Sequence, residues 1–341
     1  MEYIGLDAHR HYTVAARVDE SGAVIEQRRL KNEELPCYLA GLCGPTRVAL
    51  EATANWYHIY ELAEPLVAEV ALGHPLKTRI IAEAKIKTDK VDATILAQLL
   101  RADMLPRAYI APAAVRELRE LLRLRASLVR QRTMVRNKVH AILIKRGLKP
   151  PVGSLFGKRG RGWLGEEAAR LPQAYGDAVA CYLRVLDALQ EEIRGVSAGV
   201  EERAQLSEEA CWLDTMPGIG PYTALLILAE VGDIKRFPDA AHLASYAGLV
   251  PSVHSSGGRT RYGSLTKQGS PWLRWAMVEA AHSAMRVRGP LRERYERMRR
   301  RKPHGTAIVD LARFMLGCIY AMLTERRSFK SVPRGSREDM V

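Results

Sequence analysis

The segment MEYIGLDAHRHYTVAARVDESGAVIEQRRL, residues 1–30, decides the fold class of the first part of the chain. Three apolar stretches in it predict three β-strands, and the turn ESG separates the second from the third. The stretch HYTVAARVD alternates polar and apolar residues, which is typical of a meander with one solvent-exposed face. A sheet therefore begins the chain, and its first strand, YIGLD, ends on the acidic residue Asp7.

Further elements follow these strands. The downstream segments predict a fourth strand, a helix, a short strand and a second helix, at residues 47–51, 55–69, 69–73 and 90–104. Strands followed by alternating helix and strand are typical of an α/β domain. We expect this domain to cover residues 1–112.

Four acidic residues stand out in this domain: Asp7, Glu51, Asp89 and Asp92. Two of them end predicted strands, and the last two are three residues apart in KTDKVDATILAQLL, so they share one helix face. The simpler interpretation is that acidic residues often begin helices, where the helix dipole favours them. Together, however, the four have the layout of an RNase H-like nuclease site, which holds two Mg²⁺ ions about 4 Å apart. Lys87 and Lys90 flank Asp89 and are expected to hold phosphate.

A long basic region follows at residues 113–207. Apolar residues recur there at a three-four spacing, and Arg125 and Arg132 lie in the same seam. The Gly/Pro-rich segment LKPPVGSLFGKRGRGW predicts a loop, and a second helical run follows it, with an interruption near Pro172. Two antiparallel helices predict a coiled-coil stalk. Its cations are expected to grip a nucleic-acid backbone, together with the loop residues Lys158, Arg159 and Arg161.

The third region, residues 208–328, is expected to be mostly helical. WLDTMPGIGPYTALLILAEVGD predicts two helices joined by the turn PGIG, and two more helices are predicted near the end. The turn resembles the hairpin of helix-hairpin-helix modules, in which backbone amides, here those around Gly218 and Gly220, contact phosphate. An ordinary tight turn is the alternative. Residues 329–341 are expected to form a disordered tail.

The segment PSVHSSGGRTRYGSLTKQGS, residues 251–270, predicts a flexible loop. Its cations Arg259, Arg261 and Lys267 are expected to hold phosphate, which places a serine hydroxyl well for attack on a phosphodiester. Serine needs activation by a base or a metal, and this segment contains no Asp or Glu. His254 is only a weak candidate base. A loop that touches phosphate without chemistry is the alternative.

The charge balance points to a polyanionic partner. Lys and Arg total 52 against 38 Asp and Glu, a net charge of +14, which favours nucleic acid or an anionic membrane. No apolar run reaches the roughly 20 residues of a membrane span, and the N-terminus lacks a signal-peptide core. We therefore expect a cytoplasmic, nucleoid-associated protein without a membrane partner. The five scattered cysteines predict reduced core thiols and no zinc site.

Taken together, these segments resemble the DEDD transposases of the insertion-sequence-110 family over residues 3–328. The segments that carry the resemblance are, in order, GLDAH, ALEAT, KTDKVDA, MPGIGPYTA and GLVPSVHSSGGRTRYGSLTKQGSPWLR. The resemblance implies a RuvC-like N-terminal domain, a coiled-coil stalk and a C-terminal transposase domain. It also implies Mg²⁺ bound by the four acidic residues, and a serine nucleophile, matched here by Ser255 with the adjacent Ser256 as the fallback.

The resemblance further implies the partners and the reaction. Such recombinases act on double-stranded donor and target DNA, are guided by a structured noncoding bridge RNA, and form a covalent phosphoserine link. They assemble as dimers that pair into tetramers. Two other functions remain open from the residues alone. One is a structure-selective nuclease, such as a Holliday-junction resolvase, that cuts with water. The other is a non-catalytic nucleic-acid-binding scaffold.

Overall fold

The structure is a computed structural model that describes residues 1–81, 88–256 and 259–329. The chain forms two compact units, Met1–Ala111 and Pro112–Val341, which are described separately. The finer division at residues 113–207 and 208–328 stays a prediction. The predicted tail lies outside the described residues except for Phe329, which packs against the core of the second unit.

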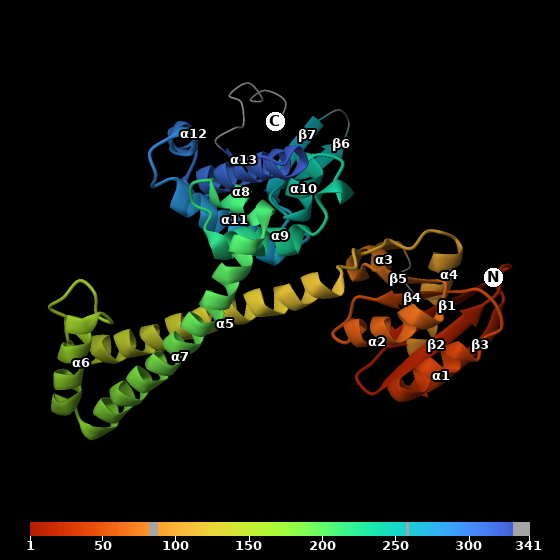
Figure 1. The fold of residues 1–341 in the computed structure, drawn as a ribbon, viewed down its shortest axis with the longest axis horizontal. Helices are drawn as coiled ribbons and strands as arrows, with labels where there is room; N and C mark the ends of the chain where they lie inside the picture. Colours follow the sequence, from red (N-terminus) through yellow and green to blue (C-terminus); the bar gives the residue numbers. More distant parts are fainter. Residues whose placement is uncertain (82–87, 257–258, 330–341) are drawn as a thin grey trace. The chain divides into compact units, whose positions relative to one another are not determined.

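The first unit contains a five-stranded mixed sheet (Figure 1). Its strands are β1 (Glu2–Ala8), β2 (Tyr12–Val18), β3 (Val24–Lys31), β4 (Thr46–Glu51) and β5 (Glu69–Gly73). They lie in the order β3-β2-β1-β4-β5; β1, β2 and β3 are antiparallel, and β1, β4 and β5 are parallel. All five predicted strands are present.

Helices cover both faces of this sheet. The helices of this unit are α1 (Leu35–Ala40), α2 (Trp56–Ala63), α3 (Pro75–Ile81) and α4 (Asp89–Arg101), with short 3₁₀ turns at Asn32–Glu34 and Glu64–Leu66. The helix predicted over residues 55–69 was too long: α2 ends at Ala63 and a 3₁₀ turn containing Pro65 follows, since proline has no N–H to continue the helix. α1 and α3 were not predicted.

Strand alternation assigns the residues of β1 to two different cores. Ile4, Leu6 and Ala8 pack with α1 and α2 on one face. On the other face, Ala49 and Ala71 of β4 and β5 pack with leucines of α4. Figure 1 shows α4 on the side of the sheet away from α1 and α2. Gly5 and Asp7 are therefore on the face that α4 covers.

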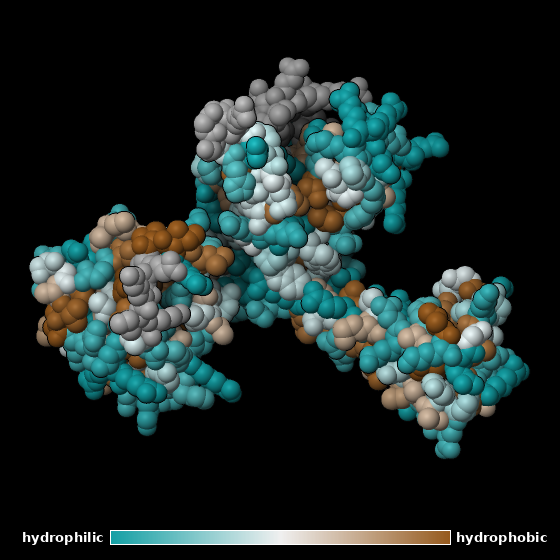
Figure 2. All heavy atoms as spheres, turned by 180° about the vertical axis from the view of Figure 1, so that it is seen from behind, coloured by the Kyte–Doolittle hydropathy of each residue, from teal (hydrophilic) through white to brown (hydrophobic). Residues whose placement is uncertain are grey.

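The surface of the first unit carries exposed apolar residues on α3. Leu76 and Ile80 are 61% and 82% exposed, and Figure 2 shows hydrophobic residues gathered on this unit. Such residues do not contribute to either core. They lie next to a gap in the described residues, because α3 ends at Ile81 and the next described residue is Thr88.

The second unit begins with two long antiparallel helices, α5 (Ala113–Lys145) and α7 (Gln173–Leu206), joined through α6 (Lys158–Arg170). Arg125 contacts Ser197 and Arg132 contacts Gln190, which fixes the antiparallel register. Buried residues of α7 recur every seven positions, at Val179, Leu186, Ile193 and Val200. This spacing is typical of coiled coils, although supercoiling itself stays a prediction.

The rest of the second unit is a helical domain with one β-hairpin. Its elements are α8 (Glu208–Asp214), α9 (Pro221–Val231), a 3₁₀ turn (Ile234–Arg236), α10 (Ala240–Tyr246), β6 (Pro251–Ser256), β7 (Arg259–Leu265), α11 (Pro271–Ala284), α12 (Pro290–Arg299) and α13 (His304–Glu325). One large apolar core joins α8–α11 and α13 to the facing ends of α5 and α7.

Two predicted loops are in fact regular structure. Residues 158–163, predicted as loop, begin α6, where Leu164 is buried and a Cβ on Gly160 would lie 2.2 Å from the Leu155 carbonyl oxygen. Glycine there allows close packing rather than breaking the helix. Residues 251–256 and 259–265, also predicted as loop, form the antiparallel β6–β7 hairpin.

The cysteine prediction was half right. All five thiols are free, as expected, but only Cys318 is buried, whereas Cys37, Cys43, Cys181 and Cys211 are exposed. They are therefore not a set of core residues.

α13 is, among the described residues, the helix that is long and apolar enough to cross a membrane. Of its most apolar window, 61% is buried inside the protein, and an ion pair joins Asp310 to Arg294 at 3.0 Å. A single such helix is weak evidence for a membrane span, because the core helix of a globular domain has the same length and composition.

Candidate active site

The contact between β1 and α4 brings the acidic residues together. Gly5 lies on the α4 face of β1, where a Cβ atom would meet the Ala93 carbonyl oxygen at 1.8 Å and the Ala97 nitrogen at 2.7 Å. Only glycine allows the two backbones to approach so closely. Thr88 caps α4 by accepting a hydrogen bond from the Val91 N–H at 3.3 Å. The helix therefore begins at Asp89, close to the end of β1.

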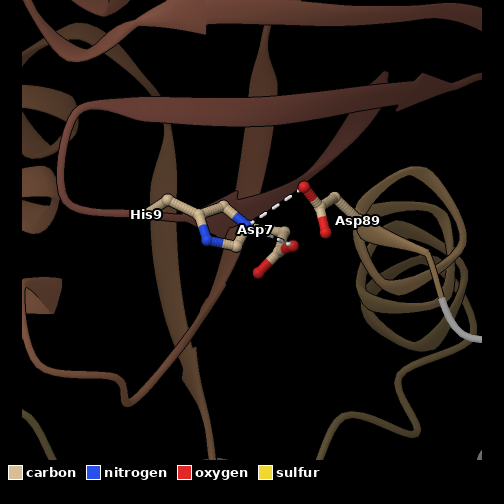
Figure 3. Close-up of side chains that lie close together, drawn as sticks. All are labelled: Asp7, His9 and Asp89. Carbon is tan, nitrogen blue, oxygen red and sulfur yellow. Dashed lines mark hydrogen bonds and ion pairs between the residues drawn. The ribbon is translucent and has the colours of Figure 1, made fainter.

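His9 lies between two of the predicted carboxylates (Figure 3). Its Nε2 atom is 3.0 Å from Oδ2 of Asp7 and 3.3 Å from Oδ2 of Asp89. The three ligand atoms lie within 4.8 Å of one another, a spacing that suits a single cation. The Asp7 side chain is 15% exposed, while those of His9 and Asp89 are 37% and 46% exposed, so the cluster is open on one side.

Two further side chains hold Asp89 in place. The Tyr12 hydroxyl donates to Oδ2 of Asp89 at 3.1 Å, and the Tyr12 ring stacks on His9 with 4.5 Å between centroids. The Arg29 guanidinium lies 3.7 Å from the centroid of the Tyr12 ring, a cation–π contact from β3. Sequence reasoning assigned no role to His9, Tyr12 or Arg29. For His9 a signal existed, since it follows Asp7 by two residues and so points to the same side.

The electrostatics of Asp7 show how closely the acidic residues approach. Burial raises the pKa of Asp7 above its usual value; His9 opposes this, and the negative charges of Asp89 and Asp92 raise the pKa further. Asp92 therefore lies near enough to repel Asp7. A cation bound among these groups would relieve that repulsion.

Glu51 reaches the same face through strand register. Leu6 of β1 pairs with Leu50 of β4 in parallel, so Asp7 and Glu51 occupy equivalent positions one residue further along. Alternation places both on the side of the sheet that α4 covers. The carboxylates of Asp7 and Asp89 thus converge directly, with Asp92 and Glu51 on the same side of the sheet. Carboxylate oxygens are the ligands that Mg²⁺ prefers, so this donor set fits a divalent metal.

The predicted nucleophile lies in the second unit, on the β6–β7 hairpin. Ser255 is exposed and pairs with Thr260, whose Oγ1 is 3.5 Å from the Ser255 Oγ. Val253 and Tyr262, which form the next pair on that face, are 55% and 74% exposed. His254 belongs to the opposite face of the hairpin because successive residues of a strand alternate. It is therefore poorly placed to act on Ser255.

The predicted phosphate-binding residues have different surroundings. Lys90, Lys158, Arg159, Arg261 and Lys267 are exposed, and Lys158 and Arg159 line a cavity of about 520 Å³ with the loop before α6. Lys87 lies outside the described residues, and so does the side chain of Arg259, the first residue of β7.

Other predicted contact residues have internal partners. Arg125 donates to Ser197 at 2.8 Å and lies 4.1 Å from the Tyr222 ring centroid, and Arg132 donates to Gln190 at 3.0 Å. Arg161 forms an ion pair with Asp187 at 2.6 Å.

The PGIG turn joins α8 to α9 as predicted, but its two glycines differ. Gly218 has φ +91°, and a Cβ there would lie 2.3 Å from the Ala280 carbonyl oxygen of α11. Gly218 therefore meets a packing and conformational requirement of the fold. Gly220 precedes Pro221 at the start of α9, and space is open where its Cβ would lie. Both glycines are half-buried, and only Gly218 is required by the packing against α11.

Comparisons with known proteins identify the family of the chain. A model for DEDD transposases of IS110 elements, described as "Transposase", matches residues 4–145, which contain the four acidic residues. A second model, described as "Transposase IS116/IS110/IS902 family", matches residues 211–296, which contain Ser255.

Two relatives that match over nearly their whole length are also named transposases. The chain is 27% identical to a "Probable family 20 transposase" of Pseudomonas aeruginosa, over 96% of this chain and 98% of that protein. It is 26% identical to the "Transposase for insertion sequence element IS1111A" of Coxiella burnetii, over 97% and 92%. A third relative matches only in part and has a different name: the "Pilin gene-inverting protein" of Moraxella bovis is 34% identical over 37% of this chain and 40% of its own length. The chain therefore belongs to the IS116/IS110/IS902 family of insertion-sequence transposases, enzymes that bind, cleave and recombine DNA.

Proposed function

We propose that this transposase recombines DNA by attack of Ser255 on a phosphodiester, assisted by Mg²⁺ held among Asp7, Glu51, Asp89 and Asp92. The observation that carries the proposal is the convergence of Asp7 and Asp89 on His9 Nε2, at 3.0 and 3.3 Å. Two carboxylates that converge on one imidazole nitrogen form a site that a divalent ion can occupy.

The acidic residues would hold two Mg²⁺ ions, the number that RNase H-like sites use. When bound, such ions stabilise charge on the attacking and leaving oxygens of phosphoryl transfer. The protein contributes the positions of the carboxylates. Tyr12 restrains Asp89 through its hydrogen bond, and the Gly5–Ala93 contact fixes the separation of β1 and α4. His9 occupies the space between two of the ligands and would move or turn when a metal binds.

Ser255 would supply the nucleophile. A bond forms between its Oγ and phosphorus, the bond from phosphorus to the leaving deoxyribose oxygen breaks, and that oxygen takes up a proton. The Ser255 proton must leave, and the described part of the hairpin offers only the Thr260 hydroxyl as a hydrogen-bond partner. Activation must therefore come from outside the hairpin. The phosphoserine link preserves the phosphodiester energy, so a second strand can rejoin without hydrolysis.

The proposed partners follow from the family resemblance and from the charge. We propose double-stranded donor and target DNA as substrates and a structured noncoding bridge RNA as guide, with homodimers pairing into tetramers. The net charge of +14 supports polyanionic partners, and binding should weaken steeply as salt rises. The protein would act in the cytoplasm, at the nucleoid.

A metal-dependent nuclease that cuts with water is the second candidate. It is favoured by one observation: the acidic cluster lies wholly within the first unit, Met1–Ala111, whereas Ser255 lies in the second. In that case the acidic residues alone would suffice for cleavage.

The variant Ser255→Ala separates the two candidates. Under the proposal, strand exchange between donor and target DNA is abolished, while DNA and RNA binding persist. Thr260→Ser is the control, since it retains a hydroxyl beside Ser255. If Ser255→Ala retains strand exchange at the wild-type rate, the proposed nucleophile is wrong. If it loses exchange but still cuts, water replaces the serine and the second candidate gains support.

A further inference from the structure

A cluster of three arginines lies where α5, α6 and α7 meet. Arg132 and Arg136 come from successive turns of α5, and Arg161 comes from the second turn of α6. They line a cavity of about 300 Å³, together with Phe156, Asp187 and Gln190. We call this cavity the arginine pocket. Its volume lies at the lower end of the range for ligand pockets, about 300–1,000 Å³.

Packing at the start of α6 builds the pocket. Gly160 lies against the Leu155 carbonyl oxygen, so α6 turns back closely on the preceding loop. The next residue, Arg161, then reaches Asp187 of α7 with 2.6 Å between Nη1 and Oδ1. Phe156 of the same loop lies beneath Arg136, with 5.1 Å from the guanidinium carbon to the ring centroid. The three helices therefore hold the guanidinium groups on rigid elements.

The charges in the pocket are not balanced. Among the described residues, Asp187 is the one carboxylate that lines the pocket, and it forms an ion pair with Arg161. Arg132 has a neutral partner, the Gln190 side-chain oxygen at 3.0 Å. Within the part of the chain that the structure describes, the Nε atoms of Arg132 and Arg136 are buried without a hydrogen-bond partner.

This arrangement is unfavourable for the protein alone. Arg132 and Arg136 are half-buried, but each buried Nε–H without a partner loses hydration that nothing replaces. Burial and the neighbouring charges of Arg132 and Arg161 lower the pKa of Arg136, which shows that the cluster repels itself. A bound anion would satisfy the free N–H groups and offset the excess positive charge. Planar guanidinium groups bind phosphate through paired hydrogen bonds, which makes phosphate the best-matched anion.

We propose that the arginine pocket binds a backbone phosphate of nucleic acid, with Arg136 as its central ligand. Arg132, in the apolar seam of the stalk, and Arg161, in the predicted loop, were both expected from the sequence to bind nucleic acid. The structure instead groups them with Arg136 around one cavity, in which a single phosphate can meet all three. The inference rests on the proposed function only in taking DNA or RNA as the partner.

The test compares Arg136→Met with Arg130→Met. Arg130 is exposed on the same helix and does not line the pocket, so it is a matched control for charge. Binding is measured by fluorescence anisotropy with a duplex of the element end and with the RNA transcribed beside the gene. Calorimetry with inorganic phosphate is the third arm. Each titration is repeated over a series of salt concentrations.

The proposal predicts that Arg136→Met weakens binding of one nucleic acid by about tenfold, the loss expected for a charged hydrogen-bonded contact. The slope of log affinity against log salt should fall by about one, as for the loss of one phosphate contact. Arg130→Met should change the affinity and the salt slope far less. The free Arg136→Met protein should melt at the same or a higher temperature, because the variant removes repulsion. If the affinity for the DNA duplex falls, the phosphate belongs to DNA; if the affinity for the RNA falls, it belongs to RNA.

Three results would overturn the inference. The first is equal nucleic-acid affinity in the two variants. The second is an effect confined to inorganic phosphate. The third is loss of the oligomer without loss of nucleic-acid binding, which would place a carboxylate of a second copy in the pocket. Failure of the proposed function looks different: wild-type protein would then bind nucleic acid normally but form no serine-dependent recombinant.

Discussion

Gly5 in β1 and Ala93 in α4 touch backbone to backbone: a Cβ atom added to Gly5 would lie 1.8 Å from the Ala93 carbonyl oxygen. The contact lies on the same face of β1 as Asp7 and on the helix that carries Asp89. It therefore fixes the distance between the two carboxylates that share His9.

Substituting Gly5 tests this relationship. Gly5→Ala should push α4 away from the sheet and lower the free energy of unfolding by about 1–3 kcal/mol, as overpacking does. Metal binding should weaken as well, because the Asp7–Asp89 separation grows. Chemical denaturation and titration with Mn²⁺ measure the two effects.

The matched control for that variant is Gly195→Ala in α7, where a Cβ would have open space. This variant should leave metal binding unchanged. It should raise the free energy of unfolding by up to about 1 kcal/mol, since alanine has a higher helix propensity than glycine. Equal metal affinity in Gly5→Ala and wild type would show that the contact does not set the site.

Removing the charge of Asp7 should separate stability from metal binding. Because burial and neighbouring acids raise the pKa of Asp7, its charged form is disfavoured in the folded state. Asp7→Asn should therefore keep or raise the melting temperature without metal. Saturating Mg²⁺ should raise the melting temperature of the wild type by a few degrees, but not that of the variant.

Asp103→Asn, at an exposed carboxylate of the same unit, is the control and should respond to Mg²⁺ like the wild type. The metal account fails if Asp7→Asn is stabilised by Mg²⁺ as much as the wild type.

Much of the first unit could be predicted from the sequence, because its strands are short apolar runs that end at turns or polar residues, and β1, β2 and β4 are buried on both faces. The four acidic residues stood out because they fall at element ends. His9, Tyr12 and Arg29 did not, because their roles depend on which side chains face them across the sheet.

The missed hairpin shows a different limit. Both faces of β6–β7 are largely exposed, Val253 and Tyr262 on one face and His254 and Arg261 on the other, so no hydrophobic alternation marks the strands. Serine and glycine there suggested a loop. In α6, glycines suggested a break, whereas Gly160 allows a tertiary contact that a single segment cannot reveal.

The second unit contains a buried carboxylate, Glu230, whose removal should be costly. Glu230 in α9 is 3% exposed, accepts from Arg123 of α5 at 2.8 Å, and accepts from the Ser270 hydroxyl before α11 at 2.8 Å. Glu230→Ala should lower the free energy of unfolding by about 3–5 kcal/mol, because its partners lose their acceptor in the interior.

Glu191→Ala removes the exposed pair with Arg194 and should change stability by about 1 kcal/mol or less. Urea denaturation of both variants makes the comparison. Equal losses would mean that the Glu230 network contributes no more than a surface pair.

Thiol reactivity should show whether the core of the second unit is packed around Cys318. Burial raises the pKa of Cys318 to about 11, so its thiolate is scarce in the folded protein. At about pH 8, iodoacetamide should modify the four exposed cysteines and spare Cys318 until the unit unfolds. Peptide mass spectrometry at increasing urea concentrations measures this, and rapid native labelling of Cys318 would contradict the packing of α13.

The central claim is that metal held by the acidic residues and the Ser255 hydroxyl act in one phosphoryl transfer. The most direct measurement is to trap the protein–DNA adduct and map its attachment site by mass spectrometry, with Mg²⁺, element-end DNA and the RNA transcribed beside the gene. The account predicts DNA phosphate covalently bound to Ser255, and no adduct with Asp7→Asn, with Ser255→Ala or without divalent metal. Strand exchange without any adduct, or an adduct at another residue, would contradict it.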